Sequence, residues 1–278
     1  MAWQPCTSQR PTEPVTQNRE IAPMRVAVVT PYHQEPRAWL QRCVESVRNQ
    51  EHACEHLLVS DGHAQDWLDG AGVRHLRLDR AHADYGNTPR SIGAQLAVAD
   101  GFHAVAFLDA DNWFEPDHVG RCVELAERTG ADFVSAARRF VREDGSVIPF
   151  ESREDRTGEH VDTSCLFLLF GAFHALPRWL LMPKPMTILG DRYFVKSMRD
   201  EGLTEARLSE PSVNYLCSWA DVYRAVGELP PAFAKNGLPT ERLGRWLRRL
   251  STTDFAQVER LSGCRIGPDC EIAARHCA

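Results

Sequence analysis

The stretch Ala104-Val105-Ala106-Phe107-Leu108-Asp109-Ala110-Asp111-Asn112 joins an apolar run directly to a group of polar side chains. The run 104–108 is short and continuous, as in a strand that is buried on both faces of a sheet. Asp109 and Asp111 follow it at once. Two carboxylates at the end of one strand can converge on a Mg²⁺ or Mn²⁺ ion and leave coordination positions open for phosphate oxygens. A polar strand-to-loop turn, in which an aspartate caps the backbone, is the alternative for the same residues.

Strands and helices alternate along the chain on both sides of this stretch. Apolar runs separated by segments with helical spacing predict βαβ units and a mostly parallel sheet. The expected strands cover residues 26–30, 56–60, 74–78, 104–108 and 132–136, and the expected helices cover 39–47, 88–98 and 116–128. Ligands of such sheets bind beyond the carboxyl ends of the strands. Polar residues stand at three of these ends, in the stretches 30–33, 61–62 and 109–112.

The pattern changes after about residue 138. A hairpin is expected around Asp144-Gly145, then an irregular segment to about Pro185, a helix over 190–201, and two further helices near the C-terminus. This division predicts a disordered tail (1–23), one domain (24–240) and a C-terminal helical extension (241–278). Within the domain, the change of pattern separates residues 24–138 from residues 139–240.

The composition is that of an ordinary globular protein. The chain has 278 residues, 43% of them hydrophobic, and a formal net charge of −6. This balance excludes a largely disordered chain and argues against a protein that coats nucleic acid. Residues 1–23 lack the apolar core of a signal peptide, and the longest apolar stretch, 165–176, is too short to span a membrane. With nine scattered cysteines, these features predict reduced thiols and a cytoplasmic location.

Several motifs together resemble the family 2 inverting glycosyltransferases, which have the GT-A fold. They stand in the family's order at residues 28–33 (VVTPYH), 46–50 (SVRNQ), 59–62 (VSDG), 89–93 (PRSIG) and 108–111 (LDAD). The resemblance covers about residues 24–200. It implies that the half 24–138 binds the nucleotide and that the half 139–240 binds the acceptor and holds the catalytic base. It implies a Rossmann-like, mostly parallel central sheet that is flanked by helices. It also implies transfer of a hexosyl or N-acetylhexosaminyl group from a UDP- or GDP-sugar, with Mn²⁺ or Mg²⁺ as cofactor.

The resemblance also implies roles for individual residues. Tyr32 would offer its ring to the nucleobase, Asp61 would accept from the base or the ribose, and Arg90, at a helix start, would bind the diphosphate. Asp109 would contact the ribose or the metal ion, and Asp111 would hold the metal ion of this DXD motif. The full set expected to bind the nucleotide sugar is Thr30, Pro31, Tyr32, Asp61, Arg90 and Asp109.

An inverting transferase needs a general base that removes the proton from the acceptor hydroxyl. The family carries this base in a Glu-Asp segment, which Gly190-Asp191 matches with glycine in place of glutamate. Asp191 is therefore the expected base, unless it only caps the helix that follows. Asp162 and Glu159 are the reserve candidates. His33 and Ser91 are two smaller departures, because the family usually has asparagine at both positions.

Two further segments have alternative interpretations. The apolar segment 165–181 is expected to pack under the sheet, although Phe167, Phe170, Phe173 and Trp179 could instead line an acceptor pocket. The basic face of the C-terminal helix could make a weak contact with an anionic membrane, but a solvated face is the simpler expectation. This basic face carries Arg242, Arg245, Arg248 and Arg249. The cysteines and the histidine at 264, 270, 276 and 277 are expected to be free side chains rather than a zinc site.

Two other functions remain open at this point. A sugar-phosphate nucleotidyltransferase would share the α/β framework, but it usually has a glycine-rich loop after the first strand, and residues 30–35 contain no glycine. A non-catalytic module that binds a nucleotide sugar is favoured only by Gly190. A dinucleotide-binding oxidoreductase is disfavoured, because no G-x-G-x-x-G motif follows the first strand. None of the motifs specifies the acceptor.

Overall fold

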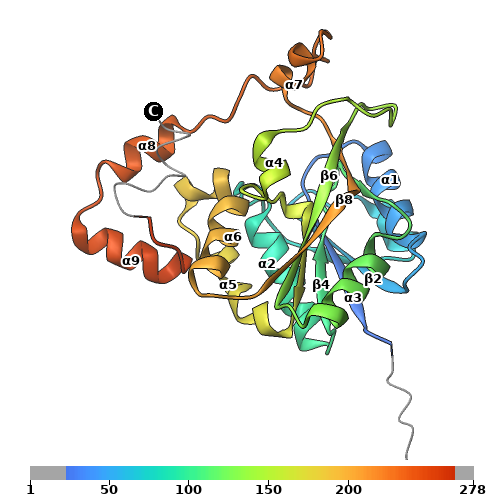
Figure 1. Ribbon diagram of the computed structural model, residues 1–278, viewed down its shortest axis with the longest axis horizontal. Coiled ribbons are helices and arrows are strands. Elements are labelled where there is room, and N and C mark those ends of the chain that lie inside the picture. The colour runs from blue at the N-terminus through green and yellow to red at the C-terminus, as the bar shows by residue number, and fades with distance from the viewer. Residues whose placement is uncertain (1–22, 267–278) are drawn as a thin grey trace, which may run out of the picture.

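The central sheet forms around the strand Val26–Tyr32 (β1), in which all residues are buried. The computed structural model describes residues 23–266 and contains one eight-stranded sheet in the order β3-β2-β1-β4-β7-β6-β8-β5 (Figure 1). The other strands are β2 (Cys54–Ser60), β3 (Arg74–Arg77), β4 (Ala104–Phe107), β5 (Trp113–Phe114), β6 (Phe133–Val141), β7 (Leu166–Leu169) and β8 (Glu205–Leu216).

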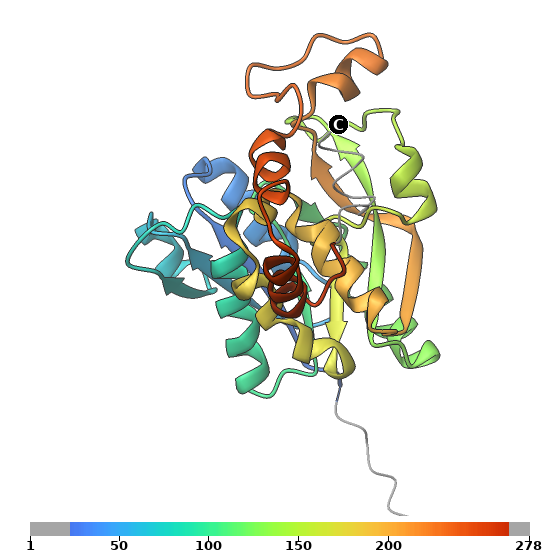
Figure 2. The ribbon, with the colours of Figure 1, turned by 90° about the vertical axis from the view of Figure 1, so that its left-hand side faces the viewer.

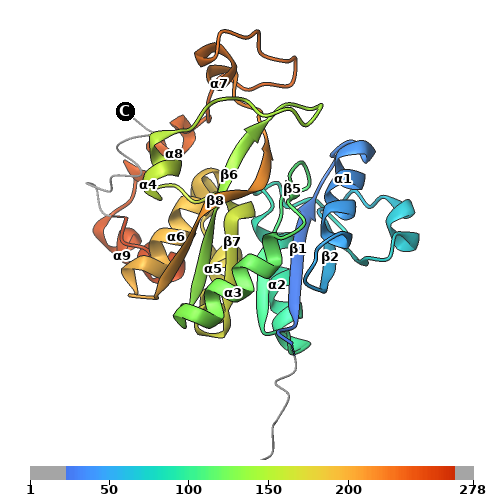
Figure 3. The ribbon, with the colours of Figure 1, turned by 45° about the vertical axis from the view of Figure 1, so that its right-hand side comes forward.

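The sheet is mixed but mostly parallel, as the sequence predicts. Strands β3, β2, β1 and β4 are parallel neighbours. Strand β7 is antiparallel to both β4 and β6, and β8 runs parallel to β6 (Figure 3). The short β5 pairs antiparallel with β8 at the edge. The carboxyl ends of β1, β2 and β4 therefore meet along one edge of the sheet.

Helices cover both faces of the sheet. The contact between Thr30 and Cys43 places α1 (Arg37–Arg48) on one face, and the close approach of Gly93 to Val29 places α2 (Asn87–Ala99) on the other. Alternate residues of β1 therefore point to opposite helices. The remaining helices of the body are α3 (His118–Thr129), α4 (Arg153–Thr157), α5 (Pro177–Leu181) and α6 (Gly190–Asp200).

Aromatic stacking connects the sheet to α5 and α6. The ring centroids of Phe107 and Trp179 lie 6.4 Å apart, and those of Trp179 and Phe194 lie 4.3 Å apart in a stacked pair. The expected packing of the apolar segment 165–181 is confirmed for Phe167, Phe173 and Trp179, which are buried, whereas Phe170 is 84% exposed.

The C-terminal part of the described chain returns over the body in three helices. They are α7 (Ala220–Ala225), α8 (Glu241–Leu247) and α9 (Thr252–Ser262). Helices α8 and α9 pack on α5, α6 and the segment before α6, through a separate apolar cluster that includes Tyr193 and Leu243 (Figure 2). The pair of helices near the C-terminus, α8 and α9, is thus as predicted.

Some local expectations are wrong. Helix α2 begins at Asn87 rather than at Thr88, because Asp84 already accepts hydrogen bonds from the backbone N–H and the hydroxyl of Thr88. The segment expected to be irregular contains β7, and β8 had no counterpart in the prediction. The predicted tail at 1–23 and the C-terminal cluster at 270–277 lie, except for residue 23, outside the described residues. No helix between residues 23 and 266 is both long enough and apolar enough to cross a membrane.

Candidate active site

A cleft of about 690 Å³ opens at the carboxyl ends of β1, β2 and β4. Most of the residues predicted to form the site meet in it: Pro31, Asp61, Arg90, Asp109, Asp111 and Asp191 all line the cleft. Asp84 and Asn87, which precede Arg90 in the chain, line it too. The segment after β8 borders it from the other side with Trp219 and Lys235.

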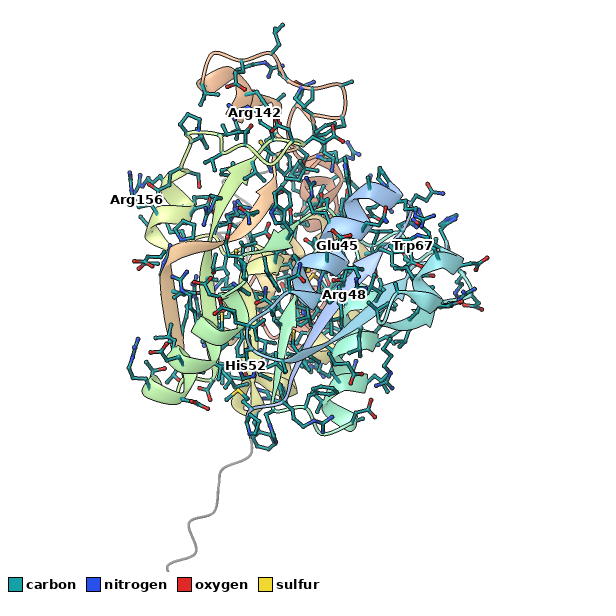
Figure 4. The ribbon with its side chains drawn as sticks, turned by 90° about the vertical axis from the view of Figure 1, so that its right-hand side faces the viewer. Glu45, Arg48, His52, Trp67, Arg142 and Arg156 are labelled. Carbon is teal, nitrogen blue, oxygen red and sulfur yellow. The ribbon has the colours of Figure 1, made fainter. Side chains whose placement is uncertain are left out.

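Arg142 helps to hold that segment in place. Its guanidinium pairs with Glu228, which follows α7, and its Nη1 donates to the carbonyl of Val147 at 2.8 Å. Figure 4 shows Arg142 near the top of the molecule, beside the loops that follow α7. The far wall of the cleft is thus tied to the end of β6.

Arg90 and Asp109 form the centre of the predicted donor side. Arg90 stands in the first turn of α2 with a side chain that is only 4% exposed, and its Nη2 lies 2.7 Å from Asp109 Oδ1. The guanidinium also lies 5.0 Å from the ring centroid of Trp179. Gly86, at φ +80, caps α2, and a Cβ there would meet Arg90 and Pro31 at 3.2–3.3 Å. The cleft therefore offers a fixed cation beside a helix N-terminus.

Asp111 carries an unusual charge environment. Burial, with the nearby carboxylates of Asp109, Asp162 and Glu35, raises the pKa of Asp111 to about 7. Glu35 lines the cleft from the loop after β1 and was not predicted. Crowded carboxylates repel one another unless a cation neutralises them. The donor set at Asp109 and Asp111 thus suits a hard divalent ion.

Asp191 lies at the start of α6 and lines the same cleft. His160 Nε2 lies 2.8 Å from Asp191 Oδ2, and the backbone N–H of Arg192 donates to Asp191 Oδ1 at 2.7 Å. Burial raises the pKa of Asp191, but the charge and hydrogen bond of His160 outweigh it and lower this pKa to about 2. The carboxylate is therefore an anion over the whole neutral range.

Strand alternation corrects two of the predicted donor contacts. Thr30 points toward α1, is fully buried, and lies 2.8 Å from His56 Nε2 through its hydroxyl. Tyr32 borders the cleft, but its side chain is 2% exposed within the α1-side core, and its hydroxyl lies 2.7 Å from His75 Nε2. Thr30 therefore does not reach the cleft, and the ring of Tyr32 offers no open face to a base. Pro31, which points the other way, does line the cleft.

Asp61 lines the cleft but is already engaged by the loop after β3. Its Oδ1 accepts from the backbone N–H of His82 at 2.9 Å, and its Oδ2 accepts from that of Ala83 at 3.3 Å. Gly62 permits this contact, because a Cβ there would come within 2.3 Å of the Ala81 nitrogen. Asp61 therefore fixes the loop that forms this wall of the cleft.

Gly190 has a steric explanation. A Cβ on this residue would lie 3.0 Å from Asn87 Oδ1 and 3.2 Å from the Trp179 ring, and both neighbours are about 1% exposed. A larger residue would therefore have to displace side chains of the cleft wall.

The sequence interpretation missed the groups around Asp191. Arg138 on β6 pairs with Asp162 at 2.7 Å and with Asp155 at 3.2 Å, and it lies over the rings of Phe140 and Tyr215. His160 belongs to none of the predicted motifs. No local signal marks it, because its partner Asp191 is 31 positions away.

One group of side chains in the described part of the chain is close enough to share a cation. His160, Asp162 and Asp191 offer ligand atoms that all lie within 4.8 Å of one another. Each of them already has a protein partner, since His160 contacts Asp191 and Arg138 pairs with Asp162. Arg90 pairs with Asp109, whereas Asp111 takes part in no ion pair within the described part of the chain.

Comparison with known proteins agrees with this architecture. S. aureus TarS 1–349 in complex with UDP is 14% identical with a TM-score of 0.54, and the match covers 86% of this chain and 70% of that one. The same fragment in complex with UDP-GlcNAc is 12% identical with a TM-score of 0.53 over the same shares. A longer S. aureus TarS structure is 12% identical with a TM-score of 0.55, and the match covers 86% of this chain and 42% of that one. These matches confirm the expected GT-A fold.

No curated protein matches the sequence of the chain. The profile of the family described as "Glycosyl transferase family 2" matches residues 27–192, which is more than half of the chain and includes every predicted site residue. The chain therefore belongs to glycosyl transferase family 2.

Proposed function

We propose that this glycosyltransferase moves a sugar from a nucleoside-diphosphate sugar to an acceptor hydroxyl, with inversion at the anomeric carbon. The observation that carries the proposal is the set of groups that the cleft brings together. A buried arginine and two carboxylates line it, and so does the ionised Asp191. The acceptor itself is not specified.

The donor side suits a diphosphate. Arg90 is positioned for charge-assisted hydrogen bonds to phosphate oxygens, and the N-terminus of α2 adds a favourable field. Pro31 and Asp61 would form the wall beside the nucleoside. The TarS structures with UDP and UDP-GlcNAc support a donor of this class, a UDP- or GDP-sugar.

We assign a divalent cation, Mn²⁺ or Mg²⁺, to Asp109 and Asp111. The crowded carboxylates around Asp111 favour this assignment, because Arg90 pairs with Asp109 and Arg138 with Asp162, while Asp111 has no ion-pair partner among residues 23–266. When bound, such an ion would neutralise charge on the departing nucleoside diphosphate.

The proposed chemistry is a single displacement. Asp191 accepts the proton of the acceptor hydroxyl while that oxygen forms a bond to the anomeric carbon. The bond between this carbon and the diphosphate oxygen breaks, and its electron pair leaves with the nucleoside diphosphate. Arg90 binds the charge that develops on the leaving group.

The two alternative functions make different predictions. A nucleotidyltransferase would release pyrophosphate from a nucleoside triphosphate and a sugar phosphate. A binding module would hold the donor without any turnover. The steric reason for Gly190 weakens the second alternative, because the glycine no longer suggests a lost active site.

The exposed arginines of the C-terminal extension support a further, weaker contact. Within residues 23–266, none of Arg242, Arg245, Arg248 and Arg249 takes part in an ion pair, and all four are exposed. We propose that they attract an anionic membrane surface. The cytoplasmic location and the division into domains remain predictions.

Asp191→Asn tests the function directly. The variant keeps the size of the side chain but removes the base, so metal-dependent release of UDP from UDP-GlcNAc should fall by about 10²- to 10⁴-fold. GDP-mannose is tested in parallel. Thermal shifts with UDP and Mn²⁺ should be retained, since the donor side is unchanged.

Asp111→Asn is the matched control for the donor side. It should lose the Mn²⁺-dependent part of the thermal shift, as wild-type protein should in EDTA. Unchanged UDP release in Asp191→Asn would contradict the role of the base, and pyrophosphate release by the wild type would favour the nucleotidyltransferase.

A further inference from the structure

His160 lies between two elements of the acceptor side and contacts both. It follows α4 in the chain, and its side chain is 12% exposed. Its Nε2 lies 2.8 Å from Asp191 Oδ2 on α6. Its Nδ1 lies 3.4 Å from Asp155 Oδ1 on α4. Both ring nitrogens thus face carboxylates of the protein, and this fixes the orientation of the ring.

Charged groups of both signs surround the pair formed by His160 and Asp191. Asp155 and Asp191 face the ring from α4 and α6, and Arg138 Nη2 approaches Nδ1 to 3.2 Å from β6. Asp162 lies next to Arg138, and Arg192 pairs with Glu154 at 2.6 Å at the rim. Burial lowers the pKa of His160, but the two carboxylates outweigh it, and the net direction is upward. The two carboxylates therefore favour the protonated form of the ring.

We propose that His160 is a positioning residue for the base: clamped between Asp155 and Asp191, it orients the Asp191 carboxylate in the cleft and keeps it ionised. This inference rests on the proposed function, because it assumes that Asp191 removes a proton. His160 itself transfers no proton to the acceptor. Its contribution is the charge at Nε2 and the direction of the Nε2–H bond.

A consequence follows for the pH dependence of the reaction. The base must be ionised, so activity is lost as the pH falls through the pKa of Asp191. His160 lowers that pKa, which keeps the acid limit of activity far below neutral. Without the imidazolium, burial and the neighbouring carboxylates would move the acid limit to higher pH.

The test compares His160→Gln with the wild type. Glutamine can still donate a hydrogen bond, but it carries no charge. The acid limb of kcat/KM for UDP release from UDP-GlcNAc should move up by about one pH unit or more, while KM for the donor stays within about twofold. His174→Gln is the control, since His174 pairs with Glu201 at 3.1 Å outside the cleft, and it should leave the profile unchanged.

An NMR titration of the His160 ring tests the pair without any turnover. The ring should titrate above the ordinary histidine range in the wild type and at lower pH in Asp191→Asn, with no change in His174→Gln. The inference is overturned if Asp191→Asn leaves the titration of His160 unchanged, or if His160→Gln leaves the acid limb in place. If neither the wild type nor His160→Gln releases UDP, but the titration of His160 still changes in Asp191→Asn, the proposed function fails and the pairing of His160 with Asp191 stands.

Discussion

Gly190 shows how a single missing side chain sets the geometry of the cleft. It lies beside Asp191 and opposite Asn87, at a helical φ of −58°. An alanine would be accepted by the backbone and would favour the helix by up to about 1 kcal/mol. The new Cβ, however, would press against Asn87 and Trp179 at 3.0–3.2 Å. Trp179 is stacked on Phe194 and cannot yield easily.

Gly190→Ala is therefore expected to lower the free energy of unfolding by about 1–2 kcal/mol, because overpacking outweighs helix propensity. Urea unfolding measures the change. Gly120→Ala in α3 is the control: its Cβ would meet only His52, at 3.8 Å, so this variant should be as stable as the wild type or more stable. Adding Asn87→Ala to Gly190→Ala should recover part of the loss. A Gly190→Ala protein as stable as Gly120→Ala would contradict the steric explanation.

At the scale of elements, α9 depends on its own cap as well as on packing. Ser251 accepts a hydrogen bond from the backbone N–H of Asp254 at 3.2 Å, and Asp254 accepts from the backbone N–H of Ser251 at 3.0 Å. Such reciprocal bonds satisfy two backbone donors at a helix start. One side of α9 packs on α5 and α6, and Val258 belongs to the C-terminal apolar cluster.

Ser251→Ala should lower the stability of the C-terminal part by about 1 kcal/mol, because one capping acceptor is lost. Hydrogen exchange of the α9 amides measures this locally. The substitution should speed exchange in α9 relative to the wild type and leave exchange in α2 unchanged. Thr253→Ala lies two residues further along the exposed first turn and removes a hydroxyl that is not part of the capping box, so it should change little. Equal effects of the two substitutions would argue against the capping box.

At the scale of the whole molecule, the net charge of −6 hides an uneven distribution. Acidic side chains gather in the cleft, where Asp109, Asp111 and Asp191 lie. The basic residues of α8 and its C-terminal end lie on the C-terminal extension, and they have no carboxylate partners among the described residues. Attraction to an anionic surface would therefore be local and sensitive to salt.

The chain should co-sediment with phosphatidylserine vesicles at low ionic strength and be released at high salt. The variant Arg245→Gln/Arg248→Gln/Arg249→Gln should bind about tenfold or more weakly, since each arginine near the surface contributes about 1 kcal/mol. Arg128→Gln/Arg224→Gln is the control, because both residues are exposed but paired with nearby carboxylates. Binding that is independent of salt, or unchanged in the triple variant, would contradict the proposed contact.

The sequence by itself determined the parts that depend on local pattern. Continuous apolar runs specify β1, β2 and β4, and the polar residues after them specify where the cleft lies, because parallel strands end at one edge. Arg90, Asp109 and Asp111 could be found in this way, since each follows a strand or begins a helix.

Only the tertiary structure decided the rest. Strand alternation turns Thr30 into the core, and this depends on which helix covers which face. Strand β8 carries exposed residues and Pro211, and it forms through pairing with β6 across a register shift. His160 meets Asp191 only because α4 and the start of α6 come together in the folded chain. Contacts between residues far apart in the chain leave no periodic trace in sequence, and the environment of the base consists of such contacts.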